Sequence, residues 1–221
     1  MSYIQEKRVE LRDLISGSFS VLGLAKRELA IYFSVFLVLS LLPETSSAIG
    51  SIVTIVSLIA YFLGQYLIYQ AILREAGLLQ DDRKRVFGFA AMALMLGFAI
   101  HVGAGLFIIP GILLGAKWIM APAYLVARDR NVFEAIGDSW RASEFNTGQL
   151  ALAYLVFWLI WLVIFMVLAG IGTAIFSSGS VVQSPFGWLA MHSLPVMMMG
   201  LSISAYRQLS DDTGSLRQVF A

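Results

Sequence analysis

The chain has 221 residues, of which 59% are hydrophobic and 13% are charged, with a net charge of +1 and no cysteine. Soluble domains carry about 25% charged residues, and a domain of this size has too little interior to hide so much apolar surface. The composition therefore predicts a membrane protein. The near-neutral charge gives no reason to expect a nucleic-acid partner, and the absence of cysteine excludes disulfides and Cys-ligated metal centres.

Apolar runs long enough for membrane spans follow one another along the chain. A bilayer core about 30 Å thick needs roughly 20 helical residues at about 1.5 Å each. The runs do not alternate, so they favour helices over the strands of a barrel. We therefore predict an all-α membrane fold with about six transmembrane helices, at Leu29–Leu42, Ala48–Leu73, Val86–Ile109, Ile112–Ala127, Leu150–Phe176 and Trp188–Tyr206.

Prolines mark the breaks in this pattern. Pro43 closes the first span, which is short and uses Lys26–Glu28 as a snorkelling end. Pro110-Gly111 is predicted to form the tight turn between the third and fourth spans. Pro195 lies inside the last span, where we expect a kink.

Two segments outside the spans have the periodicity of amphipathic helices. In Val9–Leu24 and in Asn131–Phe145, apolar residues recur at helical spacing. Asn131 and Glu134 have the spacing of a capping box at the start of the second segment. We expect both helices to lie flat on the cytoplasmic membrane surface, with their apolar faces toward the lipid.

The basic residues predict which loops share one side of the membrane. Of the 15 Lys and Arg, all except Lys117 lie before the first span, between spans two and three, between spans four and five, or after the sixth. Under the positive-inside rule these segments face the cytoplasm. We therefore predict cytoplasmic N and C termini and an even number of spans.

The two amphipathic segments share a local pattern. Ile15-Ser16-Gly17-Ser18-Phe19 aligns with Ile136-Gly137-Asp138-Ser139-Trp140, and at the same offset each segment runs into a span. This indicates either a degenerate parallel repeat or two unrelated helices with a common amphipathic pattern. The repeat would comprise 9–73 and 131–206 around a central hairpin at 86–127, within a single membrane domain, 1–221, that ends in a short tail at 207–221.

The most distinctive stretch is Phe107–Pro122, an apolar run that contains Pro-Gly, a basic residue beside an aromatic, and an Ala-Pro pair. Ser139-Trp140-Arg141 follows it. The segment 107–146 and the opening Leu14–Phe19 resemble the membrane-domain family associated with glycerophosphoryl diester phosphodiesterases. The resemblance implies a bacterial inner-membrane protein. In that family a soluble phosphodiesterase domain can carry the catalysis, and this chain lacks the acidic and histidine motifs of that domain.

Lys117 is a charge within a predicted span, and such charges usually face a protein interior or a polar cavity. Measured from the predicted turn at Pro110-Gly111, Lys117, His101 and His192 fall in the outer half of the membrane. They are candidates for an outward-facing polar pocket that holds an anionic headgroup or substrate. The alternative is that Lys117 snorkels outward while the histidines hydrogen-bond to neighbouring helices.

Other residues are candidates for packing or anchoring. Trp140 and Arg141 would anchor the second surface helix to lipid, or form a partner site. Gln65 and Gln70 would hydrogen-bond between helices, or line a pathway. Small residues would let spans three and four pack closely, with dimerisation as the alternative. They are Gly103, Gly105, Gly111 and Gly115.

Motifs for catalysis, nucleotide binding or metal binding are missing, and the predicted spans two to six contain no Asp or Glu. We therefore expect a non-enzyme without catalytic residues, cofactor or metal. The first hypothesis is a membrane module that supports envelope or lipid homeostasis or scaffolds a partner. The alternative is a carrier or flippase-like protein for a small amphiphile or anionic lipid, with its pocket near Lys117. Expected partners are membrane lipids and a protein partner or a second copy of the chain.

Overall fold

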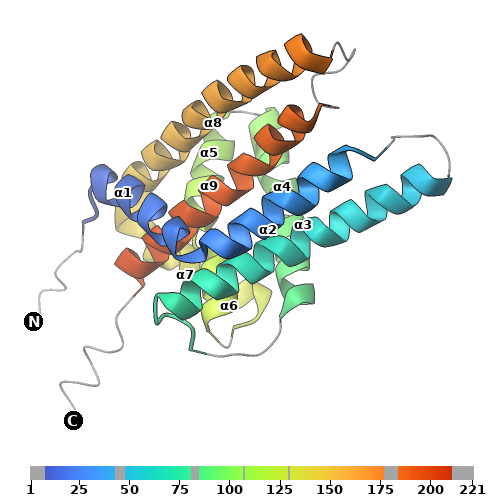
Figure 1. Ribbon diagram of the computed structural model, residues 1–221. Helices are drawn as coiled ribbons and strands as arrows, with labels where there is room; N and C mark the ends of the chain where they lie inside the picture. The colour runs from blue at the N-terminus through green and yellow to red at the C-terminus, as the bar shows by residue number, and fades with distance from the viewer. Residues whose placement is uncertain are drawn as a thin grey trace, which may run out of the picture.

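The computed structural model describes residues 8–42, 48–80, 85–106, 108–128, 130–176 and 184–210, and every regular element within these ranges is a helix. The long helices pair as antiparallel hairpins, α2 with α3, α4 with α5, and α8 with α9 (Figure 1). The elements are α1 (Leu11–Leu22), η1 (Gly23–Ala25), α2 (Lys26–Ser40), α3 (Ala48–Glu75), α4 (Val86–Leu106), α5 (Ile108–Trp118), α6 (Ala121–Ala127), α7 (Val132–Ala142), η2 (Glu144–Asn146), α8 (Thr147–Phe176) and α9 (Pro185–Leu209).

Five described segments are long and apolar enough to cross a membrane, so the fold is consistent with a multi-pass α-helical membrane protein. The 15 residues of α2 are not among them. At about 1.5 Å per residue α2 is about 22 Å long, which is less than the bilayer core of about 30 Å. The count of six spans therefore stays a prediction. The five segments are Gly50–Glu75, Val86–Gly103, Ile109–Ala127, Glu144–Ile175 and Pro185–Leu209.

The predicted turn at Pro110-Gly111 is wrong. Both residues lie inside α5, which begins at Ile108, and α4 ends before them at Leu106. A proline is tolerated in the first turn of a helix, because the N–H that it lacks would have no intrahelical partner there. The chain therefore reverses before the Pro-Gly pair.

The predicted span Ile112–Ala127 lies within the candidate span Ile109–Ala127, but it is not one continuous helix, because α5 ends at Trp118 and a new helix, α6, begins at Ala121. Pro122 explains this break. It cannot donate a hydrogen bond to the carbonyl four residues earlier, and its ring clashes with that carbonyl. Pro195, by contrast, lies within α9, which continues past it.

A helix is present in each segment predicted to be amphipathic, but the apolar face of α1 meets protein. Leu14 and Val21 are buried, and α1 packs mainly against α9. The expected placement of this face on lipid is therefore not what the structure shows. Lipid and protein interior are both apolar, so the periodicity alone does not distinguish them.

Small residues bring α1 and α9 close together. A Cβ atom at Gly200 on α9 would lie 2.9 Å from the backbone oxygen of Ser18 on α1. The Ser204 hydroxyl, one turn further along α9, donates a hydrogen bond of 3.1 Å to the carbonyl of Leu14. Small residues one helical turn apart are a common feature of helix contacts in membrane proteins.

The capping box predicted for α7 is confirmed. The Asn131 side chain accepts a hydrogen bond from the Glu134 backbone, and the Glu134 side chain accepts one from the Asn131 backbone. Ala135 and Ser139 face the bundle and are buried, whereas Phe133 is exposed. The location of this helix on a membrane surface stays a prediction.

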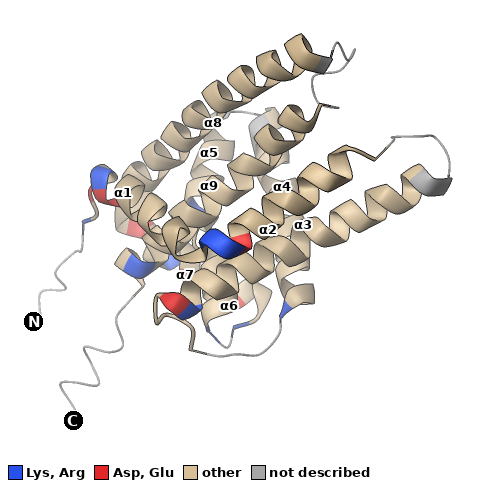
Figure 2. Ribbon diagram, viewed as in Figure 1, with Lys and Arg blue, Asp and Glu red and all other residues tan. Residues whose placement is uncertain are grey.

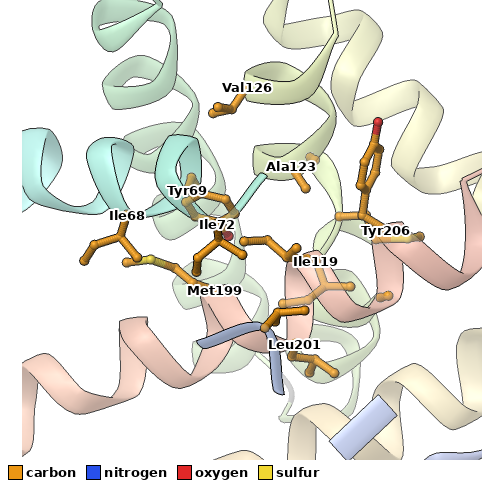
Figure 3. Packing of buried hydrophobic residues seen from close by; sticks show 14 of the residues in the cluster. Ile68, Tyr69, Ile72, Ile119, Ala123, Val126, Met199, Leu201 and Tyr206 are labelled. Atoms are coloured by element: carbon orange, nitrogen blue, oxygen red, sulfur yellow. The ribbon is translucent and has the colours of Figure 1, made fainter. Parts of the chain in front are cut away.

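The core lies where α3, α6 and α9 meet, and Figure 3 shows residues of these helices together with Ile119 packed around Ile72. In the apolar windows of Ile109–Ala127 and Pro185–Leu209, 56% and 50% of residues are buried, against 17% in those of α3 and α4. The segments that contain α6 and α9 are therefore central, and α3 and α4 present large apolar surfaces outward.

The charged residues of the described chain gather at one end of the bundle (Figure 2). This end contains the start of α1, the ends of α3 and α9, and the helices α6 and α7. The opposite end, where α2 and α8 finish, shows none among the described residues. The predicted loops at 43–47 and 177–183, and Arg83 and Lys84, lie outside the described residues.

The two halves of the chain share an order of elements. A short helix, a 3-10 turn and two long helices occur as α1, η1, α2 and α3, and again as α7, η2, α8 and α9. The predicted repeat stays a prediction, and this order agrees with it. Ser18 and Ser139, which the sequence alignment pairs, are both fully buried.

Candidate functional site

The structure does not bring the three predicted pocket residues together. His101 is exposed on α4, and its Nδ1 lies 2.7 Å from the carbonyl oxygen of Gly97, one turn earlier. Lys117 lies in the last turn of α5, with its Nζ 5.1 Å from the centre of the Trp140 ring on α7. His192 contacts a different set of helices. Neither cavity described below is lined by any of the three.

Lys117 also marks the break between α5 and α6. Its carbonyl accepts a hydrogen bond of 2.8 Å from the Ser139 hydroxyl and a longer one of 3.4 Å from Ser143. Both serines belong to the segment that forms α7 and its C-cap. The Lys117 side chain and its backbone are therefore both engaged by the amphipathic segment at the charged end.

His192 lies among aromatic rings where α2, α3 and α9 meet. Its ring stacks on Phe36, with the ring centres 3.7 Å apart, and its Nδ1 lies 3.3 Å from the Tyr32 hydroxyl. The rings of Tyr61 and Trp188 each lie 5.7 Å away. His192 therefore joins helices that are distant in the sequence.

Gln65 extends this cluster from α3. It is 7% exposed, and its side chain lies close to the hydroxyls of Tyr32 and Tyr61. Its Nε2 has no hydrogen-bond partner among the described residues. The prediction that Gln65 hydrogen-bonds between helices stays a prediction. Tyr32 and Tyr61 were not predicted to belong to a polar cluster, because aromatic residues in an apolar run are ordinarily packing residues.

The predicted packing glycines differ in their surroundings. A Cβ atom at Gly103 on α4 would lie 3.5 Å from the Cα of Gly111 on α5, so these two mark a close helix contact. A Cβ atom at Gly115 would lie 2.8 Å from the ring of Tyr154 on α8. Gly105 has open space at this position. The close contacts therefore join α5 to both α4 and α8.

Trp140 and Arg141, the predicted anchors, are exposed on α7. The Trp140 ring lies 6.2 Å from that of Trp118. Arg141 forms an ion pair of 2.5 Å with Asp138, one turn earlier on the same helix. The anchoring role stays a prediction.

Within the described part of the chain, no group of three or more acidic or histidine side chains could hold a metal ion.

A hollow with a volume of about 550 Å³ lies at the charged end, between the start of α4, α6 and the start of α7. We call it the basic hollow, because two arginines line it. Its lining residues are Arg85, Phe87, Gly88, Leu125, Arg130, Asn131, Val132 and Glu134.

Contacts around the hollow hold the two arginines in place. The Arg85 guanidinium donates to the carbonyl of Arg130, and the Arg85 backbone donates to the Tyr66 hydroxyl at 3.2 Å. Arg130 forms an ion pair of 3.1 Å with Asp138, which also binds Arg141. Asp138 therefore pairs with two guanidinium groups, and Glu134, which caps α7, lines the hollow beside the two arginines.

Part of the lining of the hollow is apolar. Phe87, Leu125 and Val132 line it, and Phe87 is 92% exposed at the start of α4. Helix α4 begins beside the hollow, and the first N–H groups of a helix have no acceptor within the helix. The lining of the hollow therefore combines hydrogen-bond donors and two arginines with apolar contacts.

From the sequence, the run Arg83-Lys84-Arg85 is most simply a topology signal, with binding of anionic lipid as the alternative, and Arg130 has no role beyond its charge. Arg85 and Arg130 are 45 positions apart in the chain. A hydrogen bond of 2.8 Å from the Gln80 backbone to the carbonyl of Ala127 brings the segment after α3 to the end of α6. The pairing depends on this tertiary contact, so no local pattern could reveal it.

Comparisons with protein-family models, with curated proteins and with solved structures find no match to this chain. The resemblance to the membrane-domain family associated with glycerophosphoryl diester phosphodiesterases therefore stays a prediction.

Proposed function

We propose that this chain is a non-catalytic multi-pass membrane protein that binds the phosphate of an anionic lipid in the basic hollow. The supporting observation is the convergence of Arg85 and Arg130, from distant parts of the chain, in a hollow that is also lined by apolar residues. An anionic phospholipid presents a phosphate directly beside hydrocarbon. Arginine suits phosphate because its planar guanidinium can donate two parallel hydrogen bonds.

The proposal places the charged end at the cytoplasmic face of a bacterial inner membrane, with both termini on that side. The positive-inside rule supports the cytoplasmic orientation of this end. The resemblance to the membrane-domain family supports the assignment to a bacterial inner membrane. Anionic lipids of the cytoplasmic leaflet attract basic segments by about 1 kcal/mol per Lys or Arg. Binding of such lipids fits a role in envelope or lipid homeostasis, or in holding a partner at the membrane.

Thiol labelling tests this orientation, because the chain contains no cysteine. Glu144→Cys places a single thiol at the charged end, and Ser178→Cys places one in the opposite loop. In intact bacterial cells a membrane-impermeant maleimide should label only Ser178→Cys, and Glu144→Cys should react after the cells are opened. The reverse pattern, or labelling of both from outside, would contradict the proposed orientation.

Lipid binding is tested with protein in detergent, titrated with phosphatidylglycerol and followed by native mass spectrometry. Arg85→Gln and Arg130→Gln should each weaken binding about tenfold, since a hydrogen bond to a charged group contributes about 1.5–3 kcal/mol. Arg12→Gln, at an exposed arginine on α1, is the matched control and should bind as the parent does. Equal affinities for the control and the two hollow variants would refute the site.

The carrier alternative has less support. It requires a pocket formed by Lys117, His101 and His192, and the structure does not bring these three residues together. Lys117 instead lies over the Trp140 ring.

A further inference from the structure

A second cavity lies between α2 and α3, with a volume of about 250 Å³. Its two walls are stripes at helical spacing, each with residues at positions i, i+3, i+4, i+7 and i+8. We call it the α2–α3 groove. It is lined by Glu28, Ile31, Tyr32, Val35 and Phe36 of α2, and by Ala60, Leu63, Gly64, Leu67 and Ile68 of α3.

Tyr32 and Gly64 form the floor of the groove. A Cβ atom at Gly64 would lie 2.5 Å from Cδ2 of Tyr32, so the tyrosine ring rests directly on the backbone of α3. The ring is held there by Phe36, 4.9 Å away, and by the contact of its hydroxyl with His192. The floor is therefore built by tight packing.

The rim of the groove faces outward and is apolar. Ile31, Val35, Leu63 and Leu67 line it and are exposed. These residues belong to α2 and to the candidate membrane span in α3. Only 17% of the residues in the apolar window of that span are buried. In a bilayer such a surface meets hydrocarbon, so the groove opens toward the acyl chains of lipids.

The groove ends at a carboxylate. Glu28 is its only acidic lining residue, and no ion pair joins Glu28 to another of the described residues. Lys26 and Arg27 precede it in the first turn of α2, and Figure 2 shows these charges adjoining at the charged end. From Glu28 to Phe36 the groove runs about 12 Å along the helix. The groove therefore runs from a group of basic and acidic residues at one end into an apolar slot.

We propose that the α2–α3 groove binds one acyl chain of a phospholipid with an ammonium headgroup, of the phosphatidylethanolamine type. The ammonium would pair with Glu28, the phosphate would lie near Lys26 and Arg27, and the chain would lie along the slot. A volume of 250 Å³ suits a single chain. The carboxylate of Glu28 at the end of the groove, unpaired among the described residues, complements an ammonium group.

Native mass spectrometry of the full chain in detergent tests the site, with phosphatidylethanolamine and phosphatidylglycerol of identical acyl chains as probes. Glu28→Gln should weaken phosphatidylethanolamine binding about tenfold, because it removes a charge-assisted hydrogen bond. Ala60→Phe should fill the slot and weaken it at least as much. The matched controls are Glu75→Gln, at the end of α3, and Ile59→Phe, on the exposed face beside the groove. Both should bind as the parent does.

Thermal unfolding in lipid-free detergent shows whether each variant is folded, and Ala60→Leu replaces Ala60→Phe if the larger ring unfolds the protein. Parent-like phosphatidylethanolamine binding by Glu28→Gln, or by a folded slot-filling variant, would overturn the proposal. A dimer that dissociates in the slot-filling variant would assign the groove to a second copy, and would also overturn it. Arg85→Gln should leave phosphatidylethanolamine binding unchanged, so this site and the basic hollow can fail separately.

Discussion

The contact between α1 and α9 gives a direct test of the packing. A Cβ atom at Gly200 would lie 2.9 Å from the backbone oxygen of Ser18 and 2.9 Å from Cδ1 of Leu22. The leucine side chain can rotate away, but the carbonyl is part of the backbone of α1. Gly200→Ala should therefore push α1 away from α9 and expose its buried face.

The size of this effect follows from two contributions. Overpacking in a tight contact costs about 1–3 kcal/mol. The hydrogen bond from Ser204 to the Leu14 carbonyl is weakened as well, and such bonds between membrane helices contribute about 0.6 kcal/mol. A total of about 2 kcal/mol should raise the population with α1 undocked about 30-fold, at a factor of ten for every 1.4 kcal/mol.

Labelling of a buried thiol measures that population. Val21 is 1% exposed, and Val21→Cys provides the only thiol in the chain. Adding Gly200→Ala should speed its reaction with a maleimide in detergent about 30-fold, since labelling requires local opening. Gly170→Ala is the matched control, because nothing lies within 4 Å of a Cβ atom there. Equal labelling rates in the Gly200 and Gly170 variants would refute the packing argument.

Two further substitutions test α7 and the central hairpin. Asn131→Ala should destabilise α7 by about 1 kcal/mol through loss of its cap, seen as faster amide hydrogen exchange in that helix, and unchanged exchange would contradict the capping argument. Gly115→Ala places a Cβ atom 2.8 Å from the Tyr154 ring and should lower stability to denaturation in detergent by about 1–3 kcal/mol. Gly105→Ala meets nothing and should be neutral or stabilise by up to about 1 kcal/mol, so equal stabilities of these two variants would count against the packing.

Local features of this chain could be predicted from its sequence. The predicted start of the third span, Val86, coincides with the first residue of α4. The capping box at Asn131 is also local, because it needs only two side chains three residues apart. Helix starts and caps are set by short-range chemistry, so they follow from the sequence without knowledge of the fold.

Other features depend on packing and could not be predicted. A Pro-Gly pair favours a turn, yet Pro110 is equally compatible with the first turn of a helix, and the structure adopts the second arrangement. Tyr32 and His192 are 160 residues apart, and no pattern near either residue indicates the other. The same holds for Arg85 and Arg130, whose meeting depends on the connection after α3.

The break between α5 and α6 has a consequence for the order in which the protein assembles. A backbone carbonyl left without a donor in hydrocarbon costs several kcal/mol, and at this break the hydroxyl of Ser139 donates to the carbonyl of Lys117. During synthesis this serine leaves the ribosome after both halves of the broken helix. The hairpin of α4, α5 and α6 can therefore reach its final packing only after α7 has been synthesised and has docked against the break.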